Sequence, residues 1–327
     1  MYRLPEIIAL AAVLLSFAIP AKADWNTDVI LKSRLSAEAD NGDFKFNCDF
    51  LRLQVKGTFA DNFSYNFRQR LNKAPTKENF LAATDYLYLN WKKNNWEIGG
   101  GKFCIACGGI EYNSSSYDLY IRPEFFNSLG GMYNYVLDGA WHHGGERFCL
   151  QFCNSLYRTS ASDLFGYSFN VSGRQGVWEH KYSVNFFERS KGNFDQFVCL
   201  GNRFNMDRVV WTLELTHRLD MARPTFFKDF SAVTKCKAEV LPWMNVFAKA
   251  TWDYKEDVAD PMLPDGTNVC QAGAGFEFYP VKKYRNLRLH AVYWNRNGNM
   301  NCVQAGLSWQ LDIFRAESRG KKQLRCD

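Results

Sequence analysis

The 327-residue chain has only 9 prolines and, after its first two dozen residues, no long hydrophobic run. No later stretch approaches the roughly 20 apolar residues of a membrane-spanning helix. No segment keeps the 3.6-residue apolar period of an amphipathic helix. No Pro/Ser-rich linker and no shift of composition marks a domain boundary. These absences exclude a helical membrane protein and favour one β-rich unit.

The motifs of common catalytic sites are missing as well. There is no G-x-S-x-G, H-E-x-x-H or P-loop sequence, and the chain has only 5 histidines. Asp163, Ser168 and His180 cannot be argued into a triad from the sequence. The adjacent His142 and His143 point to opposite faces of a strand, which favours an ordinary turn over a metal site. We therefore expect no catalytic residue, no metal and no cofactor.

Residues 1–23 have the three regions of a secretory signal peptide. The segment has a basic residue at Arg3, an apolar run over residues 7–19 and a small-x-small cleavage site at residues 21–23. The apolar run is too short to span a membrane, and no stop-transfer pattern follows it. We expect cleavage near Asp24 and export of the mature chain.

Ten cysteines in an exported chain would usually suggest disulfides, but their positions favour packing roles. Most lie in predicted strands. Cys149 and Cys153 are four residues apart on one strand, roughly 13 Å at strand rise, which is too far for a bond. Cys104 and Cys107 have C-x-x-C spacing. A redox motif needs a helix N-terminus and a zinc site needs a second ligand pair, and the sequence shows neither, which favours packing roles here too.

Residues 50–71 show a regular alternation of apolar and polar side chains. The apolar side carries Leu51, Leu53, Val55, Gly57 and Phe59 and, after a turn at Asp61 and Asn62, Phe63, Tyr65, Phe67 and Leu71, interrupted once by Gln69. The polar side carries Arg52, Gln54, Lys56, Thr58, Ser64, Asn66, Arg68 and Arg70. Each arm has about ten residues, the length of a tilted strand that crosses a bilayer. A soluble antiparallel sheet alternates too, with its apolar side facing a core. One hairpin leaves both interpretations open.

The same pattern recurs and predicts about sixteen strands. They cover residues 29–38, 50–59, 63–71, 84–91, 96–103, 130–142, 147–154, 165–172, 177–187, 196–204, 208–217, 232–240, 245–254, 269–279, 286–294 and 301–314. Tight turns alternate with longer loops, the longest at about residues 104–129. Aromatic residues make up 16% of the chain, and they favour strands and the interfacial girdles of barrels. The pattern is typical of a transmembrane antiparallel β-barrel.

In such a barrel the polar side of each strand faces the lumen. The inward positions then hold the basic residues Lys32, Arg34, Arg52, Lys56, Arg68, Arg70, Arg147, Lys181, Lys235, Lys237, Lys249 and Arg288, and the acidic residues Glu38, Glu97, Glu179, Glu214, Glu239, Asp253, Glu277 and Asp312. An Arg or Lys facing lipid at the midplane costs about 2–4 kcal/mol, so this sorting is informative. Six of the basic residues and one acidic residue fall in the first three strands, where we expect positive potential.

The hairpin at residues 50–71, the segments Gly99–Lys102 (GGGK) and Gly108–Glu111 (GGIE), and the closing strand Gln304–Phe314 (QAGLSWQLDIF) resemble the phosphate-selective porin O and P family. The resemblance covers most of residues 24–314. It implies a sixteen-stranded barrel in the outer membrane of a Gram-negative cell, commonly a trimer. It also implies that the longest loop, here residues 104–129, folds into the pore and constricts it.

Two features depart from the family pattern. Phosphate selectivity in the family is attributed to lysines on the constriction loop, whereas this loop holds Glu111, Asp118, Arg122 and Glu124. The resemblance therefore implies passage of anions without implying specificity for phosphate. Barrel proteins also usually stop at an aromatic residue. Here we expect Phe314 to lie off the face of Trp309, Leu311 and Ile313, and it is followed by residues 315–327, which we expect to be a polar periplasmic tail.

These patterns predict an outer-membrane β-barrel porin over residues 24–314 that allows passive diffusion of small hydrophilic solutes and prefers anions. The predicted pore-lining or anion-binding residues are Arg52, Lys56, Arg68, Arg70, Lys102 and Arg122. The expected partners are small anionic or hydrophilic solutes, outer-membrane lipid and lipopolysaccharide, and further copies of the chain in a homotrimer. Nucleic acid is not expected, because the basic residues alternate with apolar ones instead of clustering.

Two alternatives remain. An outer-membrane barrel enzyme of lipase or protease type would need a Ser/His or Asp/His cluster at the rim, for which His180 and His217 are candidates. A soluble, secreted β-sandwich that binds glycans would show the same alternation with its apolar side buried between two sheets.

Overall fold

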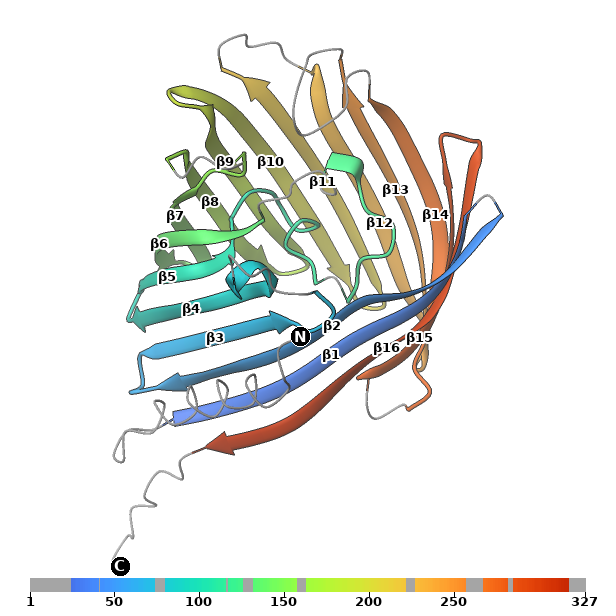
Figure 1. The fold of residues 1–327 in the computed structure, drawn as a ribbon, viewed down its shortest axis with the longest axis horizontal. Helices are drawn as coiled ribbons and strands as arrows, with labels where there is room; N and C mark the ends of the chain where they lie inside the picture. Colours follow the sequence, from blue (N-terminus) through green and yellow to red (C-terminus); the bar gives the residue numbers. More distant parts are fainter. Residues whose placement is uncertain are drawn as a thin grey trace, which may run out of the picture.

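The computed structural model describes residues 25–40, 42–73, 80–115, 117–125, 132–157, 163–221, 227–256, 267–281 and 285–317. The predicted signal peptide and residues 318–327 of the predicted tail lie outside this part. Sixteen strands form a closed antiparallel barrel, in which each strand pairs with its neighbours in the chain (Figure 1). The first strand, β1 (Trp25–Asp40), also pairs with the last, β16 (Met300–Glu317), and so closes the wall. The predicted fold class and strand number are confirmed.

The other strands lie close to their predicted positions. They are β2 (Asp43–Phe59), β3 (Phe63–Arg70), β4 (Thr84–Lys93), β5 (Trp96–Cys104), β6 (Tyr133–His143), β7 (Glu146–Asn154), β8 (Phe165–Gln175), β9 (Trp178–Ser190), β10 (Asn193–Met206), β11 (Val209–Asp220), β12 (Asp229–Leu241), β13 (Met244–Lys255), β14 (Asn268–Phe278) and β15 (Leu287–Arg296). A short 3-10 turn, η1 (Phe80–Ala83), precedes β4. Within the described residues, no helix has the length and apolar character needed to cross a bilayer.

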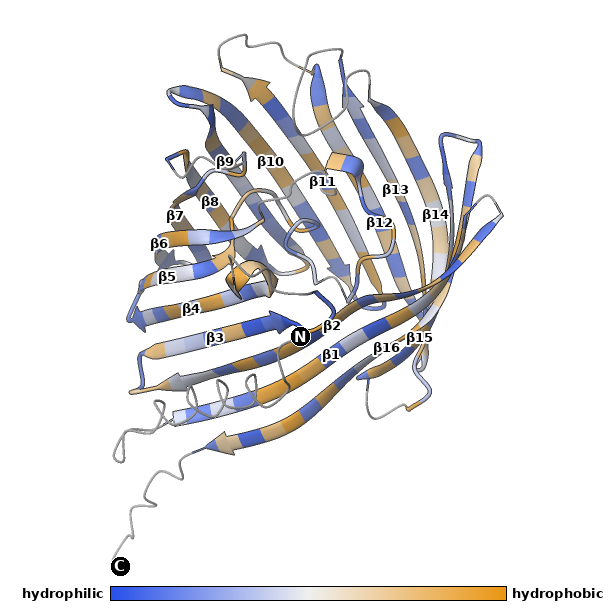
Figure 2. Cartoon of the chain, viewed as in Figure 1, coloured by the Kyte–Doolittle hydropathy of each residue, from blue (hydrophilic) through white to orange (hydrophobic). Residues whose placement is uncertain are grey.

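Apolar and polar side chains alternate along the strands, as the colours in Figure 2 show. The register places Leu53, Leu31 and Leu311 next to one another across β2, β1 and β16, and the Leu311 side chain is 54% exposed. On the other face, Arg34 lies opposite Ser308 and both are buried. A single closed sheet has only one interior, so the exposed apolar face is the outer face. This arrangement contradicts the β-sandwich alternative.

The end of β16 differs from the prediction. The strand continues to Glu317, and a β-bulge leaves Ile313 without a cross-strand partner, since Asp312 lies opposite Ile30 and Phe314 lies opposite Val29. The extra residue reverses the alternation, so Phe314 shares the outer face with Leu311 and is 50% exposed. The prediction that Phe314 lies off this face was wrong, because a period of two cannot reveal a bulge.

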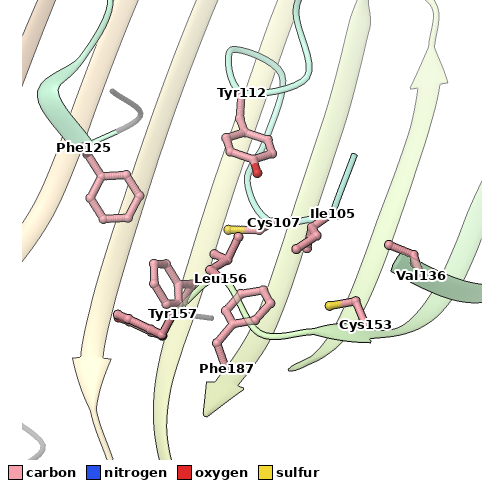
Figure 3. Packing of buried hydrophobic residues seen from close by; sticks show 10 residues of the cluster. Ile105, Cys107, Tyr112, Phe125, Val136, Cys153, Leu156, Tyr157 and Phe187 are labelled. Carbon is pink, nitrogen blue, oxygen red and sulfur yellow. The ribbon is translucent and has the colours of Figure 1, made fainter. Parts of the chain in front are cut away.

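Part of the barrel interior is filled by a hydrophobic core. The cluster consists of Ile105, Cys107, Tyr112, Phe125, Val136, Cys153, Leu156, Tyr157, Phe187 and Phe197 (Figure 3). Its first four members belong to the long connection between β5 and β6. Aromatic rings make several of these contacts, for example Phe187 with Phe197 at 5.4 Å between ring centroids. These contacts fix part of the long connection against the wall at β6, β7, β9 and β10.

The cysteines of the described part of the chain are free, and several belong to this core. Burial raises the pKa of the Cys107 thiol well above its usual value. A protonated, buried thiol is a poor nucleophile, which argues against a redox role for the C-x-x-C spacing. Its packing in the core agrees with the expected behaviour of cysteine as a small hydrophobic residue.

Candidate functional site

The described residues of the connection between β5 and β6 (105–115, 117–125 and 132), which we call the inner loop, lie inside the barrel (Figure 1). Side chains of the inner wall bind its main chain at several points. The Ala106 N–H donates to Gln151 Oε1 at 2.7 Å, and the Glu124 N–H donates to Asp253 Oδ2 at 2.9 Å. Two wall side chains donate in turn to loop carbonyl oxygens: Arg34 to Leu119 and Gln271 to Arg122, each at 2.9 Å. Because these groups come from β1, β7, β13 and β14, the loop is held across the lumen.

The segment Gly108–Glu111 lies directly on the wall because glycines face each other there. A Cβ atom on Gly201 of β10 would lie 2.7 Å from the nitrogen of Ile110, and one on Gly109 would lie 2.6 Å from Glu214 Oε2. Real Cβ atoms do not approach so closely, so a side chain at Gly201 would displace the loop, and one at Gly109 would displace Glu214 or the loop. Gly108 has φ +111°, which also favours glycine.

The acidic residues of the inner loop are paired with cations of the wall. Glu111 forms a buried ion pair with Lys249. Asp118 Oδ1 lies 2.9 Å from Arg288 Nη1, and Glu124 Oε1 lies 3.3 Å from Arg296 Nη2. Arg122, the basic residue of this loop, is exposed. The negative charge that the sequence gives this loop is thus offset by the wall.

Three arginines of β2 and β3 meet at one carboxylate, that of Asp85. The Nε atoms of Arg52, Arg68 and Arg70 lie 3.4, 3.1 and 2.7 Å from its oxygens. Arg52 and Arg70 are directly opposite in the register, where two like charges repel each other unless an anion lies between them. We call these four residues the arginine cluster. Its three cations share a single anion, so it carries net positive charge.

A β-bulge supplies the carboxylate of the arginine cluster. Arg68 pairs with Tyr86 and Gln69 pairs with Thr84, which leaves Asp85 as the extra residue of β4. Asp85 is 2% exposed. Tyrosines complete its surroundings: the Arg68 guanidinium lies 3.8 Å from the centroid of the Tyr86 ring and donates to Tyr133 Oη at 2.9 Å.

A cavity of about 140 Å³ lies between the arginine cluster and the inner loop. Its lining residues are Asp49, Arg52, Arg70, Glu111, Tyr112, Ser114, Leu119, Arg122, Pro123, Met132 and Tyr133. The two carboxylates of this lining already have partners. Asp49, the extra residue of a bulge in β2, lies 3.2 Å from Arg34 Nε, and Glu111 pairs with Lys249.

The predicted site residues fall into two groups. Arg52, Arg70 and Arg122 line this cavity, and Arg68 adjoins it at Asp85. Lys56 is exposed on β2, on the same side of the strand as Arg52, and does not belong to the lining.

Lys102 is not brought to the cavity. Its ammonium group donates to the carbonyl oxygen of Leu81 in η1 at 2.6 Å. Its cross-strand partners Leu87 and Tyr135 have exposed side chains on the outer face. Since directly paired residues share a face of the sheet, Lys102 lies on the outer side of the wall and not on the pore side. Sequence reasoning in turn missed Asp49 and Asp85, since both are bulge residues and strict alternation gives no signal for them.

The histidines named in the sequence make local contacts. His180 Nε2 lies 2.8 Å from Glu146 Oε2, and His217 Nε2 accepts the Phe227 N–H at 2.8 Å. His142 contacts Glu97 on the inner face, whereas its neighbour His143 stacks on the exposed Trp141. Across the described ranges, no group of three or more His, Cys, Asp or Glu side chains could hold a metal ion.

Comparison with known protein families identifies this barrel. The model of the family "Phosphate-selective porin O and P" matches residues 32–203, more than half of the chain. The chain belongs to this family. It is an outer-membrane porin of a Gram-negative cell, and its family and fold favour a channel over an enzyme.

Solved structures show the same fold. The anion-selective porin from Comamonas acidovorans is 13% identical, with a TM-score of 0.63 over 89% of this chain and 100% of that chain. OmpT, an outer membrane protein of Vibrio cholerae, is 10% identical, with a TM-score of 0.65 over 88% and 98%. The outer membrane channel DcaP of Acinetobacter baumannii is 14% identical, with a TM-score of 0.62 over 90% and 99%. No curated protein sequence matches the chain.

Proposed function

We propose that this porin lets small hydrophilic solutes diffuse passively across the outer membrane and favours anions over cations. The observation that carries the proposal is that Arg70 of the wall and Arg122 of the inner loop line the same narrow cavity. Both side chains are accessible, Arg70 at 31% and Arg122 as an exposed residue. A solute that passes the inner loop here meets two guanidinium groups.

The charges around the cavity support this preference. The cations are Arg34, Arg52, Arg68, Arg70, Arg122 and Lys249, and the anions are Asp49, Asp85 and Glu111. A unit charge 4 Å from an anion attracts it by about 4 kcal/mol at an effective dielectric constant near 20. Channel walls of low dielectric constant focus the electric field of these charges into the lumen, which raises the local concentration of anions there.

A channel must also release what it attracts. Arg52, Arg68 and Arg70 are each partly neutralised by Asp85, which limits how tightly a passing anion is held. Phosphate is one of the anions covered by this proposal, as the family description suggests. The described part of the inner loop contributes no lysine that would favour it further.

The pore residues can be tested by measuring reversal potentials across planar bilayers in a KCl gradient near 0.1 M. We expect Arg70→Gln combined with Arg122→Gln to lower the anion/cation permeability ratio severalfold. Lys93→Gln, which removes the same charge from the exposed end of β4, serves as control and should leave the ratio unchanged. An unaltered ratio in the double variant would exclude these two arginines from the conducting path.

The proposal includes a homotrimer surrounded by outer-membrane lipid and lipopolysaccharide. One solved structure of Vibrio cholerae OmpT is described as a trimer form. The outer wall of β1 to β4 also carries polar pairs, Thr27 with Tyr65 and Gln69 with Thr84, each joined by a 2.5 Å hydrogen bond. Such pairs suit a protein interface better than lipid. Analytical ultracentrifugation of the detergent-extracted protein should give the mass of three chains, and a single-chain mass would refute the trimer.

A further inference from the structure

We propose that the cavity beside the arginine cluster binds small organic carboxylates that carry a short apolar chain or ring, in preference to inorganic phosphate. The inference rests on the proposed function, because the ligand must first enter the lumen as an anion. It adds a ligand class that positive charge alone does not specify. The reason is that the cavity has two chemically different sides.

The first side is made of guanidinium groups. Arg70 holds Asp85 through its Nε and lines the cavity from β3, and Arg122 lines it from the inner loop. A planar guanidinium fits a carboxylate in a two-pronged geometry. Within the protein, three guanidinium groups already surround the carboxylate of Asp85, each through its Nε.

The second side is apolar. Leu119, Pro123 and Met132 line the same cavity, together with the rings of Tyr112 and Tyr133. Leu119 and Met132 are half-buried, so part of each side chain remains accessible. Methionine is flexible and polarisable, and it adapts to ligands of different shape. A ligand that only carried charge would leave this surface uncovered.

An apolar wall disfavours inorganic phosphate. The cost of removing an ion from water rises with the square of its charge, whereas its attraction to fixed charges rises only in proportion to the charge. Apolar side chains cannot replace the lost water of a dianion. Asp49 and Glu111 also lie in the lining, and although each is paired with a cation, an ionised carboxylate cannot donate a hydrogen bond to a phosphate oxygen. A singly charged carboxylate with an apolar remainder matches both sides.

The volume sets the size of the ligand. A cavity of about 140 Å³ has room for several water molecules, each of which needs about 10–15 Å³ of the space measured in this way. That space accommodates a carboxylate with a few carbon atoms.

The experiment uses the native porin in planar bilayers and measures how sodium acetate, propionate, butyrate and pentanoate block the chloride current. Phosphate is measured alongside as the inorganic reference. We expect the half-blocking concentration to fall up to about fourfold for each methylene that reaches the apolar wall, as follows from the free energy of burying one CH₂ group. We also expect butyrate to block at lower concentration than phosphate. A half-blocking concentration that is independent of chain length, or stronger block by phosphate, would overturn the proposal.

Variants then locate the binding surface. Leu119→Asn and Met132→Gln keep the side-chain size but remove the apolar surface, so we expect each to flatten the dependence on chain length. Met206→Gln, which makes the same change at an exposed position at the end of β10, should leave it intact. An unchanged dependence in both cavity variants would place the binding elsewhere and overturn the proposal.

The same recordings separate this inference from the proposed function. The reversal potential of the native protein reports anion preference directly, whereas chain-length dependence reports the apolar contact. A porin that prefers anions but shows no chain-length dependence keeps the proposed function and refutes the carboxylate site. A porin without anion preference refutes both.

Discussion

The main-chain N–H of Glu111 donates to Oε2 of Glu214 at 2.7 Å, although the two residues are 103 positions apart in the chain. The carboxylate of Glu111 itself turns to Lys249 of β13. Glu214 therefore holds the main chain of the inner loop, and Glu111 anchors the loop through its own side chain. The position of the loop in the lumen depends on β10, β11 and β13 as much as on its own sequence.

Close packing at Gly201 leads to the first prediction. Gly201→Ala places a methyl group 2.7 Å from the Ile110 nitrogen and 3.1 Å from the Gly109 Cα. Backbone atoms cannot yield as a flexible side chain can, so the inner loop must move away from β10. We expect an altered single-channel conductance and a loss of about 1–3 kcal/mol in the free energy of unfolding, as is typical of overpacking.

Gly139→Ala provides the matched control, because no heavy atom lies within 4 Å of the added Cβ. Its conductance and stability should equal those of the native protein. Equal conductance in the Gly201 and Gly139 variants would show that β10 does not set the position of the loop.

The ion pair between Glu111 and Lys249 leads to the second prediction. Both side chains are almost fully buried, so Lys249→Met leaves a buried carboxylate without its counter-ion. We expect a loss of about 3–5 kcal/mol in the free energy of unfolding. The double variant Lys249→Met with Glu111→Gln removes both charges and should be more stable than Lys249→Met alone. Denaturant titrations of the four proteins give the coupling free energy, and additive losses would argue against the pair.

The fold could be predicted from the sequence because each strand obeys one local rule. Arg52 and Leu53 are adjacent in the chain and lie on opposite faces, and this relation repeats from strand to strand. The rule fails where a residue is inserted, as at Asp49, Asp85 and Ile313. It also fails for inward-facing apolar residues, because their place in the core depends on what the inner loop packs against them.

The candidate site was only partly predictable for the same reason. The arginines of β2 and β3 follow the alternation, so their side of the strand can be read directly. Their shared partner Asp85 lies at a bulge. The ion pair of Glu111 with Lys249 joins residues that are far apart in the chain. Such contacts are set by the closure of the barrel and by the path of the inner loop, neither of which has a local sequence signal.

The shared carboxylate of the arginine cluster leads to the third prediction. Asp85→Asn removes the anion that three guanidinium groups share, so we expect a higher anion/cation permeability ratio. The increase should shrink as salt rises from 0.1 M to 1 M, because the screening length falls from about 10 Å to about 3 Å. Asp163→Asn, which removes the same charge from an exposed loop residue, should not change the ratio. A ratio that falls in Asp85→Asn would show that these arginines do not act on passing ions.

The outer face leads to the last prediction. Leu150 lies in the middle of β7 and is 67% exposed on the apolar side of the wall, whereas Met206 is 44% exposed at the end of β10. If lipid covers this wall, Leu150→Arg should lower the free energy of unfolding in phospholipid vesicles by about 2–4 kcal/mol, and Met206→Arg by about 0–1 kcal/mol, because the cost of a charge falls from the bilayer midplane to the interface. Equal losses at the two positions would mean that water or protein, and not hydrocarbon, surrounds the middle of β7.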